Sequence, residues 1–193
     1  MTSVARTLDV TARQAQGRLA GQALQIEGRR EPRTAATGCS VDVISDPATF
    51  VHLEAEWNDA VERAGLTHPF LRHEWVRTWW DAFAPPGARL HVLVVRAEGR
   101  ITAIAPFMRD TSLMYGVPAR RIRFLQNDQT PRADIIIAAR PEESYRAVWR
   151  ALRTDRDRWD VLQLSQVERA SDTRRAFCEL AYCFRLVTCW LVV

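Results

Sequence analysis

Apolar residues are densest between Leu90 and Phe107, where two runs of strand length flank the sequence Ala97-Glu98-Gly99-Arg100. Gly99 can adopt the positive φ angle that a tight hairpin turn needs. In the second run, both the odd and the even positions are at least half apolar. A strand of this kind is covered on both faces, so the pattern predicts a β-hairpin in a sheet that carries helices on both sides.

Helical spacing of apolar residues predicts four helices. Asp46-Pro47 is a typical helix start, and the apolar stripe that follows it ends at Gly65. A second helix is expected over 72–83, where an Ala-Pro-Pro-Gly sequence stops it. The last two begin at Pro141 and at Ser171 or Asp172, and the final helix turns Phe177 and Phe184 inward.

Strands are expected over 40–45, 121–125, 134–137, 159–165 and 185–193, with a loop over 109–118. The resulting order, β-α-α-β-β-β-β-α-β-α-β, predicts an α/β fold in which a mixed sheet has helices on both faces. We interpret 1–38 as a flexible leader and 39–193 as the domain. Because the chain closes on an apolar strand, we expect it to be one half of something larger.

The composition is that of an ordinary globular protein. The 193 residues are 47% hydrophobic and 26% charged, which suffices for one well-cored domain and a tail. All 27 basic residues are Arg and the net charge is +4, but these residues are dispersed along the chain, so no nucleic-acid partner is expected. There is no signal-peptide core and no apolar run of about 18 residues, which predicts no membrane span and a cytoplasmic location.

The sequence lacks the motifs of several common enzyme classes. It has neither a phosphate-binding loop of the form G-x-x-x-x-G-K-[ST] nor the dinucleotide motif G-x-G-x-x-G, and it has no H-E-x-x-H. The cysteines at positions 39, 178, 183 and 189 lack metal-ligand spacing, so buried free thiols are favoured over zinc or a disulfide. ATP-, NAD- and metal-dependent chemistry are therefore disfavoured.

Asp134 is the strongest single candidate for chemistry. It precedes the apolar run 135–137 and follows a polar segment. A carboxylate in this place can act as a general base or bind a substrate hydroxyl. It can also be a strand-start residue that hydrogen-bonds the preceding turn, and this structural interpretation is favoured.

Two further sets lie on the second predicted helix. His73-Glu74 is a possible acid–base pair, although polar residues at a helix start are more often exposed. Trp75, Trp79 and Trp80 could stack on a sugar or a peptide, but an aromatic stripe at helical spacing more often belongs to a core.

Arg120, Arg121 and Arg123 form a third set, in the strand predicted near 121–125. Guanidinium groups bind phosphate or carboxylate through paired hydrogen bonds. A solvated strand face is the favoured alternative.

Several segments together resemble the first half of the CelD/BcsL family of the GNAT acyltransferase superfamily, which is related to the FemAB peptidyltransferases. They are HPFLRHEWVRTWWDAF, LHVLVVRAEGRITAIAPF, RRIRFLQND, RADIII and RWDVLQLS, and the likeness covers about 41–171. The family is linked to cellulose and other exopolysaccharide biosynthesis. The resemblance implies a GNAT-like fold and transfer of an acyl group from acyl-CoA to an amine or hydroxyl of a sugar or cell-envelope precursor.

The resemblance also implies where donor and acceptor bind. Family members are nearly twice as long, and their acetyl-CoA site belongs to the second half. The superfamily's pyrophosphate loop, [QR]-x-x-G-x-[GA], has no match here, so no cofactor is expected to bind this chain alone. Trp75 and Asp134 match acceptor-binding positions of the FemAB relatives, which makes them candidate substrate contacts.

Two kinds of partner follow from these interpretations. One is a missing second GNAT-like half that supplies the donor. The other, in an alternative function, is a protein partner or a second copy that pairs with the C-terminal strand of a non-catalytic interaction module.

Overall fold

The computed structural model describes residues 38–127, 130–183 and 189–190, and its helices and strands run as follows. They are β1 Ser40–Ile44, α2 Pro47–His52, α3 Glu54–Arg63, the 3-10 turn η1 Pro69–Leu71, α4 His73–Phe83, β2 Arg89–Leu90, β3 Val92–Ala97, β4 Arg100–Ala105, β5 Phe107–Met114, β6 Val117–Phe124, β7 Ile136–Ile137, α5 Pro141–Thr154, the 3-10 turn η2 Arg156–Arg158, β8 Val161–Gln163, α6 Asp172–Cys183 and β9 Cys189–Trp190. The predicted leader, apart from Gly38, and Phe184 lie outside the described residues.

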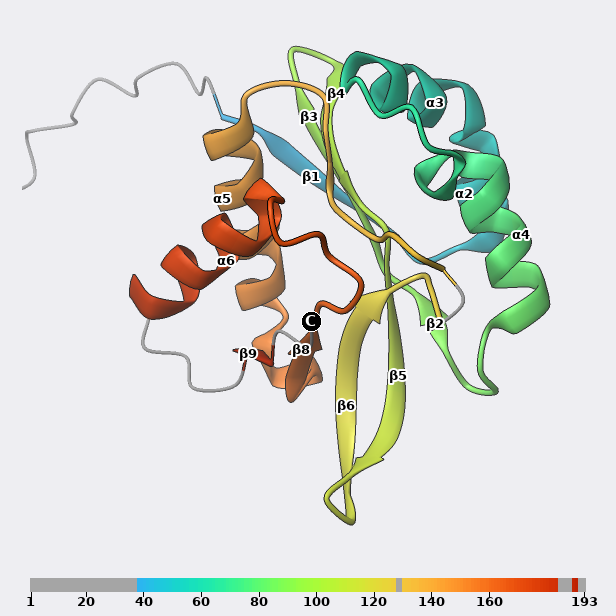
Figure 1. Ribbon diagram of the computed structural model, residues 1–193, viewed down its shortest axis with the longest axis vertical. Coiled ribbons are helices and arrows are strands. Elements are labelled where there is room, and N and C mark those ends of the chain that lie inside the picture. Colours follow the sequence, from blue (N-terminus) through green and yellow to red (C-terminus); the bar gives the residue numbers. More distant parts are fainter. Residues whose placement is uncertain (1–37, 128–129, 184–188, 191–193) are drawn as a thin grey trace, which may run out of the picture. The chain divides into compact units, whose positions relative to one another are not determined.

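The strands form two sheets (Figure 1). The first is antiparallel, in the order β1-β3-β4-β7. The second is mixed, in the order β2-β5-β6-β8-β9, because β6, β8 and β9 run parallel. The predicted α/β class is therefore confirmed, with the strands divided between two sheets.

The β3–β4 hairpin is confirmed, and both of its faces are covered. Glu98 and Gly99 form its turn with φ angles of 52° and 78°. Leu93 and Val95 pack in a core with α5 and α6, whereas Val92 and Val94 pack in a second core with α2, α3 and α4. Figure 1 shows these two groups of helices on opposite sides of the first sheet.

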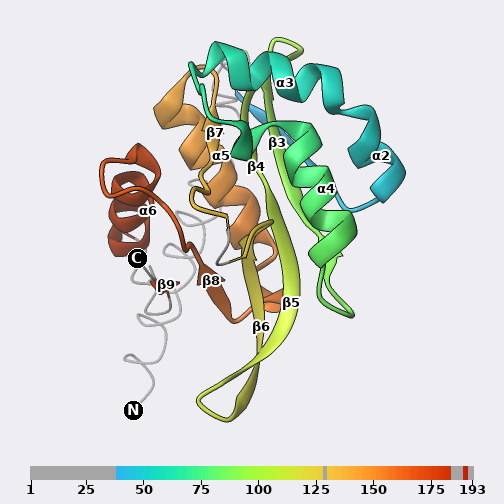
Figure 2. The same ribbon diagram turned by 45° about the vertical axis from the view of Figure 1, so that its right-hand side comes forward.

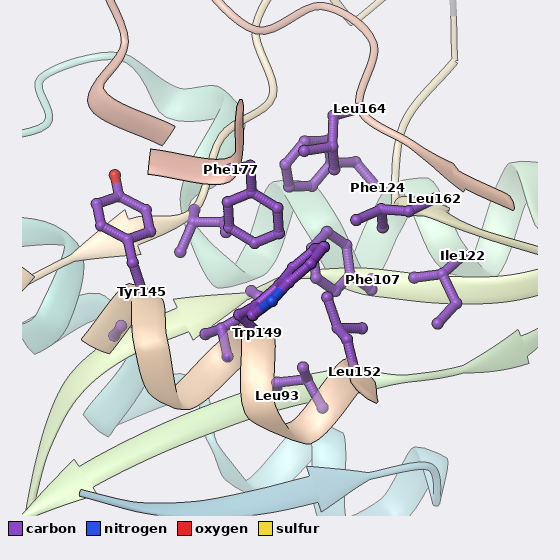
Figure 3. Packing of buried hydrophobic residues seen from close by; sticks show 14 of the residues in the cluster. Leu93, Phe107, Ile122, Phe124, Tyr145, Trp149, Leu152, Leu162, Leu164 and Phe177 are labelled. Carbon is purple, nitrogen blue, oxygen red and sulfur yellow. The ribbon is translucent and has the colours of Figure 1, made fainter. Parts of the chain in front are cut away.

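The core under α5 and α6 is rich in aromatic rings (Figure 3). Trp149 on α5 meets Phe177 on α6 edge to face, with ring centroids 5.6 Å apart and planes at 86°. Phe107 and Phe124, which are cross-strand partners at the start of β5 and the end of β6, lie 5.1 Å apart in the same core. Burial of these rings fixes α5 and α6 against the sheets.

The loop predicted over 109–118 is wrong. These residues belong to a second hairpin, β5–β6, whose register runs from Phe107 opposite Phe124 to Met114 opposite Val117. Its turn consists of Tyr115 and Gly116, with φ angles of 52° and 82°. The sequence does not alternate here because this hairpin has no buried face along most of its length.

Smaller differences concern the limits of elements. The predicted first helix divides at Leu53 into α2 and α3, although Asp46 caps it as expected by accepting a hydrogen bond from Thr49 N at 2.8 Å. The strands expected over 134–137 and 159–165 shrink to β7 and β8, and β2 is an added strand. Of the last predicted strand, β9 is the described part.

No helix among the described residues is long and apolar enough to cross a membrane. Cytoplasmic location stays a prediction. Cys39 and Cys178 are free thiols, but Cys39 is half-buried and Cys178 is exposed, so the expected burial is wrong for these two.

Candidate functional site

Polar residues gather beyond the carboxyl ends of the parallel strands β6 and β8. Such strand ends are where α/β sheets commonly bind ligands. The segments that follow the two strands are joined by a hydrogen bond from Ala133 N to Gln166 O at 3.0 Å. Figure 2 shows the two segments leaving the ends of β6 and β8. We define the polar cluster as His68, Gln126, Asp134, Ser165, Ser171 and Thr173.

Asp134 is held by α6. Its Oδ2 accepts a hydrogen bond from Ser171 Oγ at 2.7 Å, and its Oδ1 accepts one from Ile135 N at 2.8 Å. Burial raises the pKa of Asp134, and the nearby charge of Glu168 adds to this effect, while hydrogen bonds from Ser171 and Thr173 oppose it. The role of Asp134 is structural, but the favoured interpretation is wrong about its partner, because the carboxylate binds Ser171 just before α6 and not the preceding turn.

His68 is the residue of the cluster that can accept a proton. Its Nδ1 is buried and has no hydrogen-bond partner among the described residues. Burial lowers the pKa of His68, and the positive charge of Arg132 lowers it further, which outweighs the carboxylates of Glu168 and Asp134. The imidazole is therefore neutral at pH 7, the form that a general base requires.

Gln126 supplies a second buried atom without a partner. The residue is 4% exposed, and its Nε2 donates to Ser165 Oγ at 2.8 Å. Its Oε1 has no hydrogen-bond partner among the residues described. Buried polar atoms are nearly always paired with protein, water or a ligand, so each of these two atoms is available for a hydrogen bond with a bound molecule.

Contacts between aromatic rings connect Trp75 to His68 of the polar cluster. It is 39% exposed on α4, and its indole meets Phe70 edge to face at 5.0 Å and 85°. The ring of Phe70 in turn lies 5.8 Å from that of His68. Ring contacts thus link Trp75 to His68, and His68 in turn lies close enough to Asp134 to sense its charge.

The other candidate residues on α4 do not form a common site. His73 is fully buried, and its Nε2 lies 2.9 Å from Phe50 O, whereas Glu74 is exposed and accepts a hydrogen bond from Asn58. They do not form an acid–base pair. Of the tryptophans, Trp79 is in the core at 4% exposure, so the aromatic stripe is core only in part.

The three arginines of β6 are occupied by carboxylates of this chain. Arg120 donates to both oxygens of Asp160, at 2.9 and 2.7 Å. Arg121 and Arg123 both bind Asp110, at distances of 2.8 to 2.9 Å. An anion entering here would have to displace these ion pairs.

A groove of about 760 Å³ separates α5 from α6. Tyr145 and Trp149 line it, and the hydroxyl of Tyr145 lies 2.9 Å from Thr173 Oγ1, which joins the groove to the polar cluster. Burial raises the pKa of Tyr145 to about 12, so the phenol stays protonated. The α5 side of the groove carries Glu142, which pairs with Arg146, and two further arginines, Arg150 and Arg153.

The start of α5 does not fit the pyrophosphate of acetyl-CoA. A helix N-terminus binds phosphate through free N–H groups and its positive dipole end. Here Pro141 occupies the first position, and Glu142 and Glu143 place two negative charges in the first turn. The Arg140 side chain is paired with Glu98 at 2.6 Å. The described residues also contain no cluster of three metal-ligating side chains.

Comparison with known proteins gives weak similarity. No protein-family model matches the sequence, and a search of curated proteins finds no match. Three crystal structures resemble the fold. A ribosomal-protein-alanine N-acetyltransferase from Brucella melitensis biovar Abortus 2308 is 12% identical, with a TM-score of 0.49 over 81% of this chain and 96% of that one.

The other two structures are similar at a lower level. A possible acetyltransferase from Clostridium difficile 630 is 11% identical, with a TM-score of 0.45 over 80% of this chain and 94% of its own. An aminoglycoside acetyltransferase, meta-AAC0020, from an uncultured soil metagenomic sample in complex with sisomicin, is 12% identical, with a TM-score of 0.40 over 80% and 92%. At these values, function must be argued from the residues of this chain.

The sequence patterns do not identify His68 and Gln126 as candidate site residues. A lone His before Pro and a Gln at a strand end have no periodic signal that sets them apart. Their importance comes from burial without a partner, which only the folded chain reveals.

Proposed function

We propose that this chain is the acceptor-binding domain of a GNAT-type acyltransferase of the CelD/BcsL kind. The polar cluster would bind an amine or hydroxyl of a sugar or of an exopolysaccharide or cell-envelope precursor. The observation that carries the proposal is that two buried atoms, His68 Nδ1 and Gln126 Oε1, have no hydrogen-bond partner in the part of the chain that the structure describes.

Each residue has a part in this proposal. Gln126 Oε1 accepts a hydrogen bond from the acceptor, and the exposed indole of Trp75 stacks on its ring. The neutral His68 accepts the proton that the nucleophilic nitrogen or oxygen loses. Asp134 is a positioning residue, because it holds Ser171 and the start of α6 beside the acceptor.

The donor, an acyl-CoA, would be held by a second GNAT-like unit. The acidic first turn of α5 supports this division, because Glu142 and Glu143 disfavour a pyrophosphate. A protein that joins this domain to such a unit would have the acceptor on one part and the thioester on the other.

Acceptor binding tests the proposal. Calorimetric titration of the chain with glucosamine and with glucan and chitin oligosaccharides should detect binding of at least one. Gln126→Ala should weaken it about fivefold, since one hydrogen bond contributes about 1 kcal/mol. His52→Gln, which changes an exposed histidine on α2, is the matched control and should leave affinity unchanged.

The result that would overturn the proposal is equally definite. If none of these sugars binds while acetyl-CoA binds the chain tightly, the assignment of acceptor and donor is wrong. If a sugar binds and Gln126→Ala has no effect, the polar cluster is not its site.

The edge position of β9 keeps the alternative function open to test. In that alternative the C-terminal strand pairs with a partner, and the chain is not catalytic. Replacing Trp190 with Pro should abolish such pairing and leave sugar binding intact.

A further inference from the structure

The far part of the β5–β6 hairpin projects away from both cores (Figures 1 and 2). We define the arm as residues 110–120. Leu113, Tyr115 and Val117 are 72%, 89% and 64% exposed. Leu113 lies opposite Pro118 and Val117 lies opposite Met114, so these apolar side chains fall on opposite faces of the ribbon. The face that carries Leu113 and Pro118 is exposed, whereas Ser112, Met114 and Ala119 on the other face are half-buried.

Among the described residues, the backbone of β5 has an unpaired outer edge at Thr111 and Leu113. On β6, by contrast, the N–H of Arg120 donates to Asp160 Oδ2 and its carbonyl oxygen accepts from Asp160 N, both at 2.8 Å. β2 pairs with β5 only at Met108 and Arg109, and β8 pairs with β6 only at 121–123. Phe107 O accepts a hydrogen bond from His91 N, so the backbone groups of Phe107 point away from β6. Because this direction alternates along an antiparallel strand, the N–H and C=O groups of Thr111 and Leu113 also point outward.

The two edges differ in their protection against pairing. Native proteins protect exposed edges with proline and charged side chains. The outer edge of β6 has Pro118, which lacks an N–H, and Arg120, which is tied to Asp160. The outer edge of β5 over 111–114 reads Thr-Ser-Leu-Met, with neither a charge nor a proline.

We propose that two copies of this chain associate by antiparallel pairing of β5 with β5 across a two-fold axis at Leu113. A two-fold axis perpendicular to the sheet keeps each side chain on its own face, so paired positions must have the same parity. Leu113 then meets Leu113 of the second copy and exchanges two backbone hydrogen bonds with it. Ser112 meets Met114, and Thr111 meets Tyr115.

The chemistry of the edge favours a second copy as its occupant. Asp110, the nearest charge on β5, is neutralised by Arg121 and Arg123, so no like charges meet across the axis. Pairing also turns a two-stranded ribbon, which is marginal alone in water, into a four-stranded sheet. The association does not depend on the proposed acceptor site, since the arm shares no residue with the polar cluster.

Sedimentation velocity from micromolar to millimolar concentration tests the association. The wild-type chain should change from monomer to dimer over this range. Leu113→Lys should weaken the dimer at least tenfold, because it places two ammonium groups at the axis. Val117→Lys is the matched control, since it adds the same charge to an equally exposed apolar position at the protected edge.

Thermal unfolding of each variant confirms that it is folded, and Thr111→Lys repeats the test at the other outward position. A wild-type chain that stays monomeric at millimolar concentration would overturn the proposal. So would equal weakening by Leu113→Lys and Val117→Lys, which would indicate general charge repulsion or a different contact surface.

Discussion

Two consecutive hairpins of this chain are closed by the same turn and have opposite surroundings. Glu98-Gly99 joins β3 to β4, and Tyr115-Gly116 joins β5 to β6, with nearly equal φ angles in both turns. β3 and β4 are buried on both faces, whereas the far ends of β5 and β6 are exposed on one face and only half-buried on the other. The comparison shows that the residues of the turn determine where a hairpin forms. The pattern of apolar residues indicates only whether other elements cover the faces of that hairpin.

The largest expected difference is in side-chain truncation. Ile104→Ala, in the fully buried part of β4, should lower the free energy of unfolding by about 2–5 kcal/mol, because it leaves a cavity. Leu113→Ala on the arm should change it by less than about 0.5 kcal/mol. Urea denaturation measures both. A large loss for Leu113→Ala would mean that the arm packs against something and would break the contrast.

His91, near the junction of the two hairpins, should make the free energy of unfolding depend on pH. Burial lowers the pKa of His91 to about 4, and the neighbouring Arg109, which pairs with Asp155, contributes. The unfolded chain binds this proton near pH 6.5, so stability should fall by up to roughly 3 kcal/mol as the pH drops from 6.5 to 4. His91→Gln should flatten this slope in denaturation curves, whereas His52→Gln should not.

Asp110, at the base of the arm, should contribute less to the free energy of unfolding than His91. Asp110 is 6% exposed, and despite its burial the hydrogen bonds from Arg121 and Arg123 lower its pKa. Asp110→Asn should cost about 2 kcal/mol at pH 7, because two half-buried guanidinium groups lose their charged partner. This stabilisation exists above the unfolded pKa and is lost as the pH falls through the folded one. The gap between variant and wild type should therefore close in strong acid.

Substitutions in the two turns should have the smallest effect on the free energy of unfolding, and they test the comparison of the two hairpins most directly. Gly99→Ala places a Cβ at a φ of 78° and should lower the free energy of unfolding by about 1 kcal/mol. Gly116→Ala, at 82°, carries the same backbone strain. Its effect on global unfolding should be smaller, because fraying of the arm relieves the strain without opening a core. Equal effects would mean that the arm folds as one unit with the cores.

The sequence was most informative where burial is strongest. The β3–β4 hairpin and the α/β class follow from apolar runs and a glycine turn, and they are confirmed. The β5–β6 hairpin was missed because Arg109, Asp110 and Thr111 read as a polar loop. In the fold, cross-strand ion pairs replace the apolar face that a pattern search requires.

The residues of the candidate site also differ in how far the sequence predicts them. Asp134 stood out because an acid before an apolar run is a local feature. His68 could not, since its surroundings, among them the charges of Arg132 and Glu168, come from residues more than sixty positions away. Whether Asp134 and Trp75 contact an acceptor stays a prediction, as does the division of the chain at residue 38.

The chain changes sheets at Pro106, between the end of β4 and the start of β5. This residue is buried, and its carbonyl oxygen accepts a hydrogen bond from Leu125 N at 2.8 Å. No loop separates this buried position from the arm, because β5 begins at Phe107 inside the core and continues as one strand to Met114. One strand thus anchors the exposed arm in the packed interior.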